Sequence, residues 1–399
     1  MSQRMFYTSF IFVLLSYLGI FSLVSASPIT KASDGLSKRS LGESQPLHIT
    51  SRDTTTRFNE IGASFTLASA ENKVGSAGTY PRLARLSDGG ILSVSTVVNS
   101  GNERVLTVFR SDDNGVTFSQ IGTIASSTGD LDNGFLLQLP SGTVLAAFRN
   151  HDLNANRVAT YYRITVCSST DGGRTWAFSA QAAEQAANGY NGLWEPFMRI
   201  GNDGAIQLTY SGELSQTNQE TFRVLSRDEG KTWTTPTNLH LHGDQQLRDG
   251  MQGIVSTKDA GTGQNALVMV FEINDNTHVY LGTMTSYDDG NTWGNRDTIF
   301  RPANHNAGAP QIASIGNNLA VVFMTDEDRA VSELAWPNKA DIKMIFSTQL
   351  RNGQATWTSQ TFDLSGQSSY WPGIFQRDTN DVIAVYERGV PYGKVISAA

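Results

Sequence analysis

Two glutamates stand out in this sequence of 399 residues because bulky apolar residues surround each of them. Glu195 lies in the run Leu-Trp-Glu-Pro-Phe at residues 193–197, and Glu272 follows Val-Met-Val-Phe at residues 268–271. Burial among apolar neighbours raises the pKa of a carboxyl group. Cleavage of a glycosidic bond needs two facing carboxyl groups, one to protonate the leaving oxygen and one to act as base or nucleophile. The competing interpretation of each glutamate is a structural salt bridge with an arginine.

The composition excludes several other kinds of chemistry. The net charge of −7 and the absence of a Lys/Arg block argue against a nucleic-acid partner. A single cysteine, Cys167, excludes a disulfide framework and a Cys-rich zinc site. The histidines are scattered without metal-ligand spacing, and no Ser-His-Asp order or phosphate-binding loop occurs. We therefore expect no metal and no cofactor.

A repeated motif indicates the elements that must position the two glutamates. The pattern Ser-x-Asp-x-Gly-x-Thr-aromatic begins at Ser111, Ser169, Ser226 and Ser286, and a degenerate copy follows Ser347 at a similar interval. In such a turn Ser and Asp bind the backbone and Gly supplies a positive φ. This is the Asp-box, or BNR repeat, of sialidase-type propellers, and we expect its Asp residues to be structural.

A second repeat gives the number of units. It consists of an apolar strand, a turn and a second apolar strand, and the copies are Tyr80–Thr96, Asn133–Arg149, Trp194–Ser211, Arg248–Glu272, Ala307–Met324 and Trp371–Glu387. Short strands at a fixed period are typical of a propeller. We predict an all-β fold, a single six-bladed β-propeller over residues 40–399.

The second repeat also predicts which residues surround the ligand. In an antiparallel pair the start of the first strand lies beside the end of the second. These strand tips, rich in charged and aromatic residues, should therefore encircle one mouth of the central channel. Besides the two glutamates, the substrate-binding candidates are Tyr80, Arg82, Asn133, Arg149, His151, Trp194, Tyr210, Asp249, Gln311, Tyr370, Trp371, Glu387 and Arg388.

The N-terminal residues read as targeting segments. Arg4 precedes an apolar run to Val24, and small residues follow, so residues 1–26 are predicted to be a signal peptide rather than a membrane anchor. Residues 27–39 end in Lys38-Arg39 and are predicted to be a propeptide. We expect a secreted, extracellular protein that has no membrane segment after cleavage and acts on an extracellular glycan. We also expect a monomer, because a closed propeller has no free sheet edge.

The motifs resemble those of the fungal exo-α-L-1,5-arabinanases of glycoside hydrolase family 93. The resemblance rests on the Asp-boxes, on Asn-Gly-Leu-Trp-Glu-Pro-Phe at residues 191–197 and on Val-Phe-Glu at residues 270–272, and it covers residues 50–399. It implies a retaining mechanism that releases arabinobiose from the non-reducing end of linear plant cell-wall arabinan. It also implies Glu195 as general acid/base and Glu272 as nucleophile, although the motifs identify the pair better than the two roles.

Two alternatives stay open on the sequence alone. An exo-sialidase would need an arginine triad, for which Arg82, Arg248 and Arg388 are available. The order at residues 80–83 is Tyr-Pro-Arg-Leu, however, and not the aromatic-Arg-Ile-Pro order of sialidases. A non-catalytic carbohydrate-binding propeller is the second alternative, because Asp-boxes do not by themselves imply catalysis.

Overall fold

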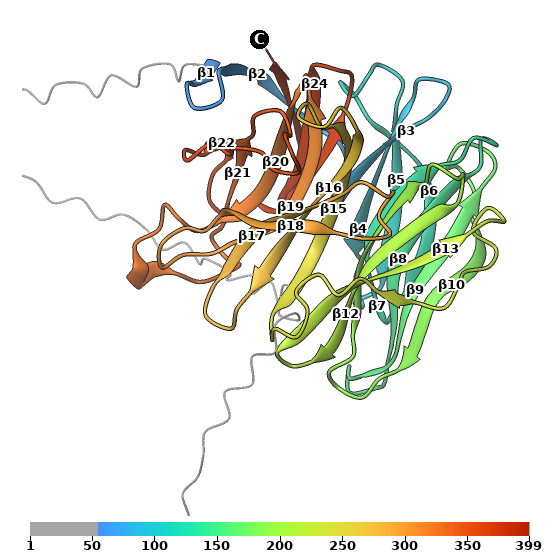
Figure 1. Ribbon diagram of the computed structural model, residues 1–399. Helices are drawn as coiled ribbons and strands as arrows, with labels where there is room; N and C mark the ends of the chain where they lie inside the picture. Colours follow the sequence, from blue (N-terminus) through green and yellow to red (C-terminus); the bar gives the residue numbers. More distant parts are fainter. Residues whose placement is uncertain (1–54, 399) are drawn as a thin grey trace, which may run out of the picture. The chain divides into compact units, whose positions relative to one another are not determined.

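The computed structural model describes residues 55–398, so the predicted signal peptide and propeptide lie outside the described residues. Within this range the regular structure consists of strands and one short 3-10 helix, η1 (Val331–Glu333) (Figure 1). No helix among these residues is both long enough and apolar enough to cross a membrane. The predicted all-β class is confirmed.

The strands form antiparallel meanders, named here I to VI in chain order. Meander I comprises β3 (Thr79–Arg85), β4 (Ile91–Val98), β5 (Arg104–Ser111) and β6 (Ser119–Ser127). Meander II comprises β7 (Asp130–Gln138), β8 (Val144–Leu153), β9 (Ala159–Ser169) and β10 (Ala177–Ala186). Meander III comprises β11 (Leu193–Ile200), β12 (Ile206–Ser215), β13 (Asn218–Ser226) and the short β14 (Thr237–Asn238).

The remaining strands complete the fold. Meander IV comprises β15 (Arg248–Lys258), β16 (Asn265–Asn274), β17 (Val279–Ser286) and β18 (Gly294–Phe300). Meander V comprises β19 (Ala307–Ile315), β20 (Asn318–Thr325), β21 (Asp341–Phe346) and β22 (Phe362–Ser365). Meander VI comprises β23 (Tyr370–Gln376), β24 (Asp381–Arg388) and β25 (Val390–Ala398), to which β2 (Ala63–Lys73) and β1 (Thr55–Phe58) add from the other end of the described chain.

The first strands of the meanders contact one another in a closed ring. Strands β3, β7, β11, β15, β19 and β23 each pack against the next, and β23 packs against β3. Pairing of β2 with β25 joins the two ends of the described chain in one sheet. This arrangement is a propeller, as the Asp-box repeats predicted.

The number of sheets differs from the prediction of six blades. Hydrogen bonding gives five sheets within residues 55–398, and four of them contain one meander each. The fifth has eight strands, because meanders III and IV are joined through a single parallel pair, Gln219 with Arg248. Six separate sheets are therefore not observed.

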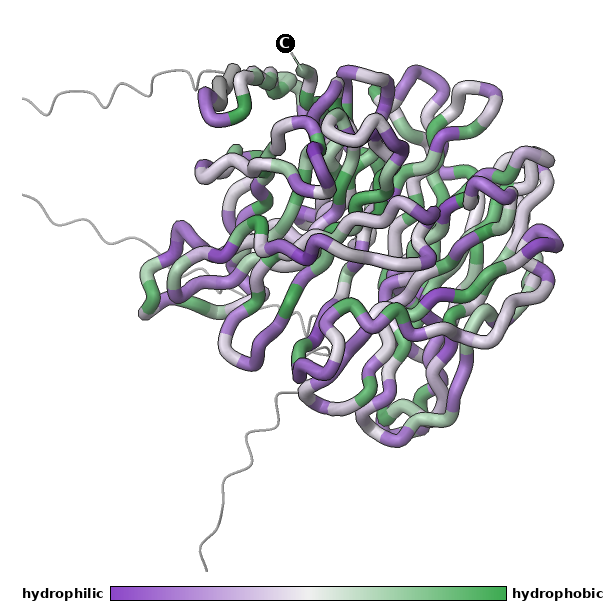
Figure 2. The backbone as a smooth tube through the Cα atoms, in the orientation of Figure 1, coloured by the Kyte–Doolittle hydropathy of each residue, from purple (hydrophilic) through white to green (hydrophobic). Residues whose placement is uncertain are grey.

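The apolar core lies at the seams between neighbouring meanders. One cluster joins I to II, another joins II to III, and two more join IV to V and V to VI. Hydrophobic stretches follow the strands and hydrophilic ones follow the connections (Figure 2). Each meander thus depends on its neighbours to bury its faces.

The Asp-boxes form the turns that the sequence predicted, and they lie between the third and fourth strands, at the end of the propeller opposite the first-strand starts. In the second copy Gly173 has φ 92°, its amide donates to Ser169 Oγ at 2.9 Å, and Thr175 Oγ1 donates to Asp171 Oδ2 at 2.6 Å. The degenerate fifth copy lacks its own Asp. There the amide of Gly353 donates instead to Asp259 of meander IV, at 2.7 Å.

Replacement of Asp171 by alanine should lower the melting temperature and leave kcat unchanged. Hydrogen bonds from Thr175 and Ser169 hold the pKa of this exposed carboxyl well below its usual range, which shows that the turn stabilises the ionised form. Thermal unfolding and initial rates on the same preparation measure both quantities. A fall in kcat without a fall in melting temperature would contradict the structural assignment of the Asp-boxes.

Candidate active site

Every first strand carries a bulge near its start. The bulged residues have φ between 50° and 56°, and they are Tyr80, Asn133, Glu195, Met251, Ala309 and Trp371. A non-glycine residue with positive φ stores backbone strain, and bulges re-aim side chains beside functional sites. The bulges therefore mark the predicted mouth of the channel as the candidate site, and Glu195 is itself one of the bulged residues.

Glu195 is held by groups from meanders III and IV. Its Oε2 accepts hydrogen bonds from Ser211 Oγ at 2.9 Å and from the amide of Met251 at 3.0 Å. The side chain of Gln252 donates to the carbonyl oxygen of Glu195 at 3.0 Å. Burial raises the pKa of Glu195. The two hydrogen bonds to its carboxylate and the charges of Arg149 and Arg248 oppose that rise.

Glu272 has fewer donors, and its pKa is raised as well. It lies near the end of β16, and its Oε2 accepts one hydrogen bond, from the amide of the bulged Ala309 at 2.7 Å. Burial, and then the negative charge of Glu195, raise its pKa to about 7. At neutral pH this carboxyl is therefore poised between its protonated and ionised forms.

The two carboxyl groups lie close enough for the charge of Glu195 to act on Glu272. Gly250 is the cross-strand partner of Glu272, and a Cβ placed on Gly250 would lie 3.5 Å from Glu195 Oε2. Repulsion by the negative charge of Glu195 therefore contributes to the raised pKa of Glu272. The structure thus places both predicted glutamates at the same mouth, and their catalytic roles stay a prediction.

Trp336, a tryptophan of meander V, borders Glu272. A Cβ placed on Gly308 would lie 2.8 Å from Glu272 Oε2 and 3.0 Å from Trp336 Cζ2, so both groups surround the same point. Trp336 belongs to the connection between β20 and β21, and it packs beside the central cluster that contains Met251 and Ala309. Nothing in the sequence pattern had singled out Trp336.

On the other side of Glu195, a buried charged cluster supports Trp194. The Arg149 guanidinium lies 5.1 Å from the Trp194 ring centroid and donates to Asn133 Oδ1 at 2.8 Å and Asp130 Oδ1 at 3.1 Å. Burial, and then the charge of Arg149, lower the pKa of His151 to about 4, so neutral His151 donates to the carbonyl oxygen of Leu193 at 2.7 Å. This cluster of Arg149, Asn133 and His151 thus positions β11 and Trp194.

Meanders I and VI complete the mouth. Arg82 stacks over the Tyr80 ring at 3.8 Å and donates to the carbonyl oxygen of Trp371 at 3.2 Å. Glu387 accepts a hydrogen bond from Thr79 Oγ1 at 3.1 Å, and burial raises its pKa. Burial also raises the pKa of Tyr80 to about 12, so its hydroxyl stays protonated. Tyr370 and Trp371 are partly buried beside the cluster between V and VI.

The structure places four other predicted ligand residues away from the mouth or behind it. Tyr210 is buried in the core and stacks on Phe222, with ring centroids 5.7 Å apart. Asp249 is fully buried and accepts hydrogen bonds from both terminal nitrogens of Arg296. Gln311 donates a hydrogen bond to the carbonyl oxygen of the bulged Met251 at 3.3 Å.

The fourth of these residues, Arg388, lies on the outer side. It is exposed and pairs with Glu71 of β2. Successive side chains of a strand point to opposite faces, so Glu387 can face the mouth only if Arg388 does not.

Besides Trp336, four residues at the site were not among the predicted substrate-binding residues: Ser211, Gln252, Gly308 and Arg248, the last of which was named only for the sialidase triad. Arg248 contacts Glu213 at 2.6 Å, and its charge opposes the raised pKa values of both candidate glutamates. One signal could have located the bulges. The residue after the bulged position is proline in four of the first strands, at Pro81, Pro196, Pro310 and Pro372.

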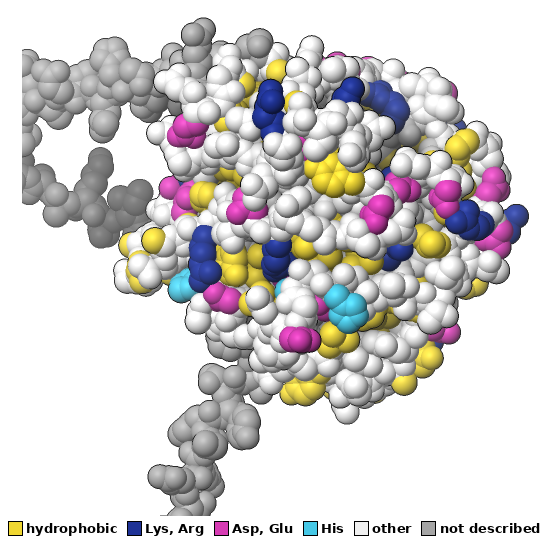
Figure 3. Space-filling model, viewed as in Figure 1, with side chains coloured by type: hydrophobic (Ala, Val, Ile, Leu, Met, Phe, Trp, Pro, Cys, Tyr) yellow, Lys and Arg dark blue, Asp and Glu magenta, His cyan; other side chains and the backbone are white. Residues whose placement is uncertain are grey.

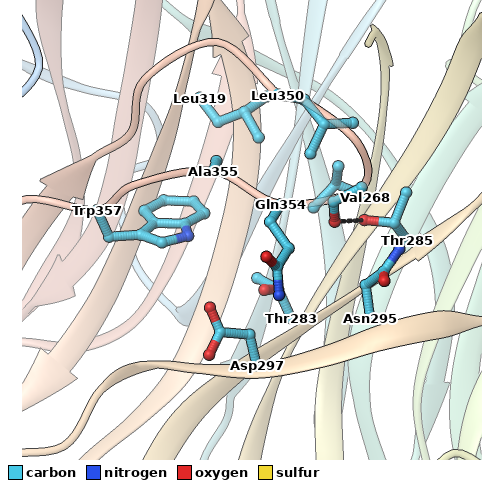
Figure 4. A pocket seen from close by; sticks show the side chains of 11 residues that line it. Val268, Thr283, Thr285, Asn295, Asp297, Leu319, Leu350, Gln354, Ala355 and Trp357 are labelled. Carbon is cyan, nitrogen blue, oxygen red and sulfur yellow. Dashed lines mark hydrogen bonds between the residues drawn. The ribbon is translucent and has the colours of Figure 1, made fainter. Parts of the chain in front are cut away.

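Three further features lie outside this site. The hollow in Figure 4 lies between meander IV and the fifth Asp-box turn, where Thr285 donates to the carbonyl oxygen of Gly353 at 2.9 Å. The face shown in Figure 3 mixes acidic and basic side chains without one dominant sign. Among residues 55–398 no group of three His, Cys, Asp or Glu side chains could hold a metal ion.

Comparisons with known proteins agree with the fold. The BNR repeat-like domain family matches residues 128–331. No curated protein matches the chain. A mutant of the alpha-L-arabinofuranosidase of Fusarium graminearum, in complex with an iminosugar inhibitor, has a TM-score of 0.61 and 19% identity over 80% of this chain and 92% of that chain.

Two further solved structures are similar. The alpha-L-arabinanase of Penicillium chrysogenum complexed with arabinobiose has a TM-score of 0.61 and 18% identity over 83% of this chain and 98% of that chain. A Hadza microbial sialidase has a TM-score of 0.51 and 16% identity over 81% of this chain and 65% of that chain. At these identities the likeness establishes the fold, and the chemistry has to be argued from the residues.

Proposed function

Since this chain belongs to the family of proteins with a BNR repeat-like domain, we propose that it is a secreted, monomeric glycoside hydrolase. We take its eight-stranded sheet as two blades, which makes the propeller six-bladed. The observation that carries the proposal is the convergence of Glu195 and Glu272, one well supplied with donors and the other with a pKa of about 7. A pair of carboxyls in different protonation states is what a glycosidase requires.

The proposed substrate is linear α-1,5-L-arabinan, cleaved from its non-reducing end to release arabinobiose. The motif resemblance supports this choice, as do the two similar structures whose proteins are an arabinanase and an arabinofuranosidase. Trp194, Tyr370 and Trp371 are partly exposed, and their rings would stack on the apolar faces of sugars.

The electrostatics favour exchanging the roles that the motifs suggested. Two donors and two nearby arginine charges oppose the rise that burial gives to the pKa of Glu195, whereas burial and the charge of Glu195 raise the pKa of Glu272 to about 7. Glu272 would protonate the leaving glycosidic oxygen while Glu195 attacks the anomeric carbon and forms a covalent arabinosyl ester. Water, deprotonated by Glu272, would then attack the same carbon and release Glu195.

Product analysis on linear, debranched arabinan tests this function. Arabinobiose as the sole early product is the expected result. Sialyl-lactose in a parallel reaction should yield no free sialic acid, because Arg388, which a sialidase triad would need, lies on the outer side and pairs with Glu71. Free sialic acid would establish the sialidase alternative, and no product in either reaction would favour a carbohydrate-binding propeller.

A further inference from the structure

The tryptophans of this chain fall into two groups according to their indole N–H. Trp176, Trp233 and Trp293 belong to Asp-boxes, and each donates to the glycine carbonyl of its own turn, at 2.9, 3.2 and 3.2 Å. Trp357 packs in the fifth Asp-box seam. Within residues 55–398 neither Trp357 nor the remaining three tryptophans have a hydrogen bond at the indole nitrogen. Trp194, Trp336 and Trp371 differ from Trp357 because they lie, partly exposed, at the mouth. An indole with a free N–H and an accessible ring can both stack on a sugar and donate to a hydroxyl.

Trp336 is carried by a strap, residues 326–340, that connects β20 to β21 and projects at the left of Figure 1 in orange. Both ends of the strap are fixed. Asp326 is fully buried and accepts the amide of Asn306 at 2.7 Å, and Arg329 donates to Asp341 Oδ1 at 2.6 Å. With both ends anchored, the strap forms a wall beside the mouth.

The absence of a side chain at Gly308 brings the wall to the carboxyl group. Any Cβ there would meet Glu272 and the six-membered ring of Trp336 at once. The backbone of Gly308 does not adopt a positive φ, so space and not conformation requires glycine at this position. A sugar held against Glu272 would therefore also contact Trp336.

We propose that Trp336 is a specificity-determining residue: it binds a sugar unit beside the scissile bond and ends the cleft on the Glu272 side, so that chains are cut from an end. This inference rests on the proposed function. Removing the indole should open the cleft and remove the stacking contact, while the two carboxyl groups stay in place on β11 and β16.

The test compares Trp336→Ala, Trp336→Phe and the wild-type chain on two substrates. One is p-nitrophenyl α-L-arabinofuranoside, which has no neighbouring sugar, and the other is end-labelled linear arabino-oligosaccharide. For Trp336→Ala we expect kcat/KM on the oligosaccharide to fall about 10- to 100-fold. We expect the aryl substrate to change little, and internal cuts to appear beside arabinobiose. Trp336→Phe keeps an aromatic ring but has no N–H, so its kcat/KM on the oligosaccharide should lie between those of Trp336→Ala and the wild type.

Val331→Ala is the matched control, because Val331 lies on the same strap and its side chain is 62% exposed. It should behave as the wild type. An equal loss on both substrates, or an unchanged product pattern with Trp336→Ala, would overturn the assignment while the wild type remains an arabinanase. A wild-type chain that cleaves neither arabinoside would overturn the proposed function and this inference together.

Discussion

Replacement of Glu272 by alanine is expected to lower kcat on debranched arabinan by at least ~10²-fold, because the leaving oxygen then departs without a proton. An aryl arabinoside should suffer less in its first step, since its leaving group needs no protonation. Azide should restore turnover and give the arabinosyl azide of retained configuration, because Glu195 still forms the covalent intermediate that azide attacks. Initial rates and NMR of the azide product measure both effects.

The companion variant, Glu195→Ala, separates the two roles. Without its nucleophile the enzyme should lose at least ~10²-fold on both kinds of substrate. Azide can then attack the anomeric carbon directly, so the product should have inverted configuration. An inverted azide from Glu272→Ala and a retained azide from Glu195→Ala would restore the roles suggested by the motifs. Full activity in either variant would remove that glutamate from the catalytic pair.

The pH profile follows from the same assignment. The proton on Glu272 must be present for the first step, and its pKa is raised to about 7 by burial and by Glu195. The value of kcat/KM on arabinan should therefore decline as the pH rises through about 7. For Glu272→Gln the residual rate should show no such decline.

The raised pKa also has a consequence for stability. Folding favours the protonated form of Glu272, so its contribution to the free energy of unfolding is present at low pH and is lost as the pH rises through about 7. Glu272→Gln cannot ionise and should exceed the wild type in stability at pH 8, by about 2 kcal/mol, with little difference at pH 5. Thermal unfolding at the two pH values measures this gain, and an equal shift at both would contradict it.

Gly308→Ala should abolish most activity without unfolding the protein. The new methyl group would lie 2.8 Å from Glu272 Oε2 and 3.0 Å from Trp336 Cζ2, both closer than ordinary contact. The carboxyl group must then move away from the Ala309 amide that positions it. Displacement of a reacting group by about 1 Å costs on the order of 10²-fold in rate, and overpacking costs about 1–3 kcal/mol of stability.

Gly294→Ala provides the control for this substitution. Gly294 also begins a strand region without positive φ, and nothing lies within 4 Å of the position of its Cβ. It should retain wild-type kcat and melting temperature. If Gly308→Ala also retains kcat, Glu272 does not act from the position described here.

Much of this protein follows from local sequence patterns. Ser, Asp, Gly and Thr of an Asp-box bind one another within a few residues, as Ser169, Asp171 and Thr175 do, so the motif predicts the turn without knowledge of the rest of the chain. The antiparallel order of the strands then predicted which strand tips encircle the mouth of the channel, and it placed Glu195 and Glu272 among them. These interactions are local in the sequence, and that is why the repeat could be read directly.

What the sequence did not determine depends on how separate meanders pack together. The parallel pair between Gln219 and Arg248 joins two sheets, and the left-handed bulge at Ala309 points its amide at Glu272 of the preceding meander. Trp336 reaches the site only because Gly308 leaves room for it. Local patterns thus predicted the propeller class, the Asp-box turns and the candidate pair of glutamates. Which rim residues face the channel, and which neighbours set their pKa values, depends on distances between residues far apart in the chain, and no local pattern encodes those distances.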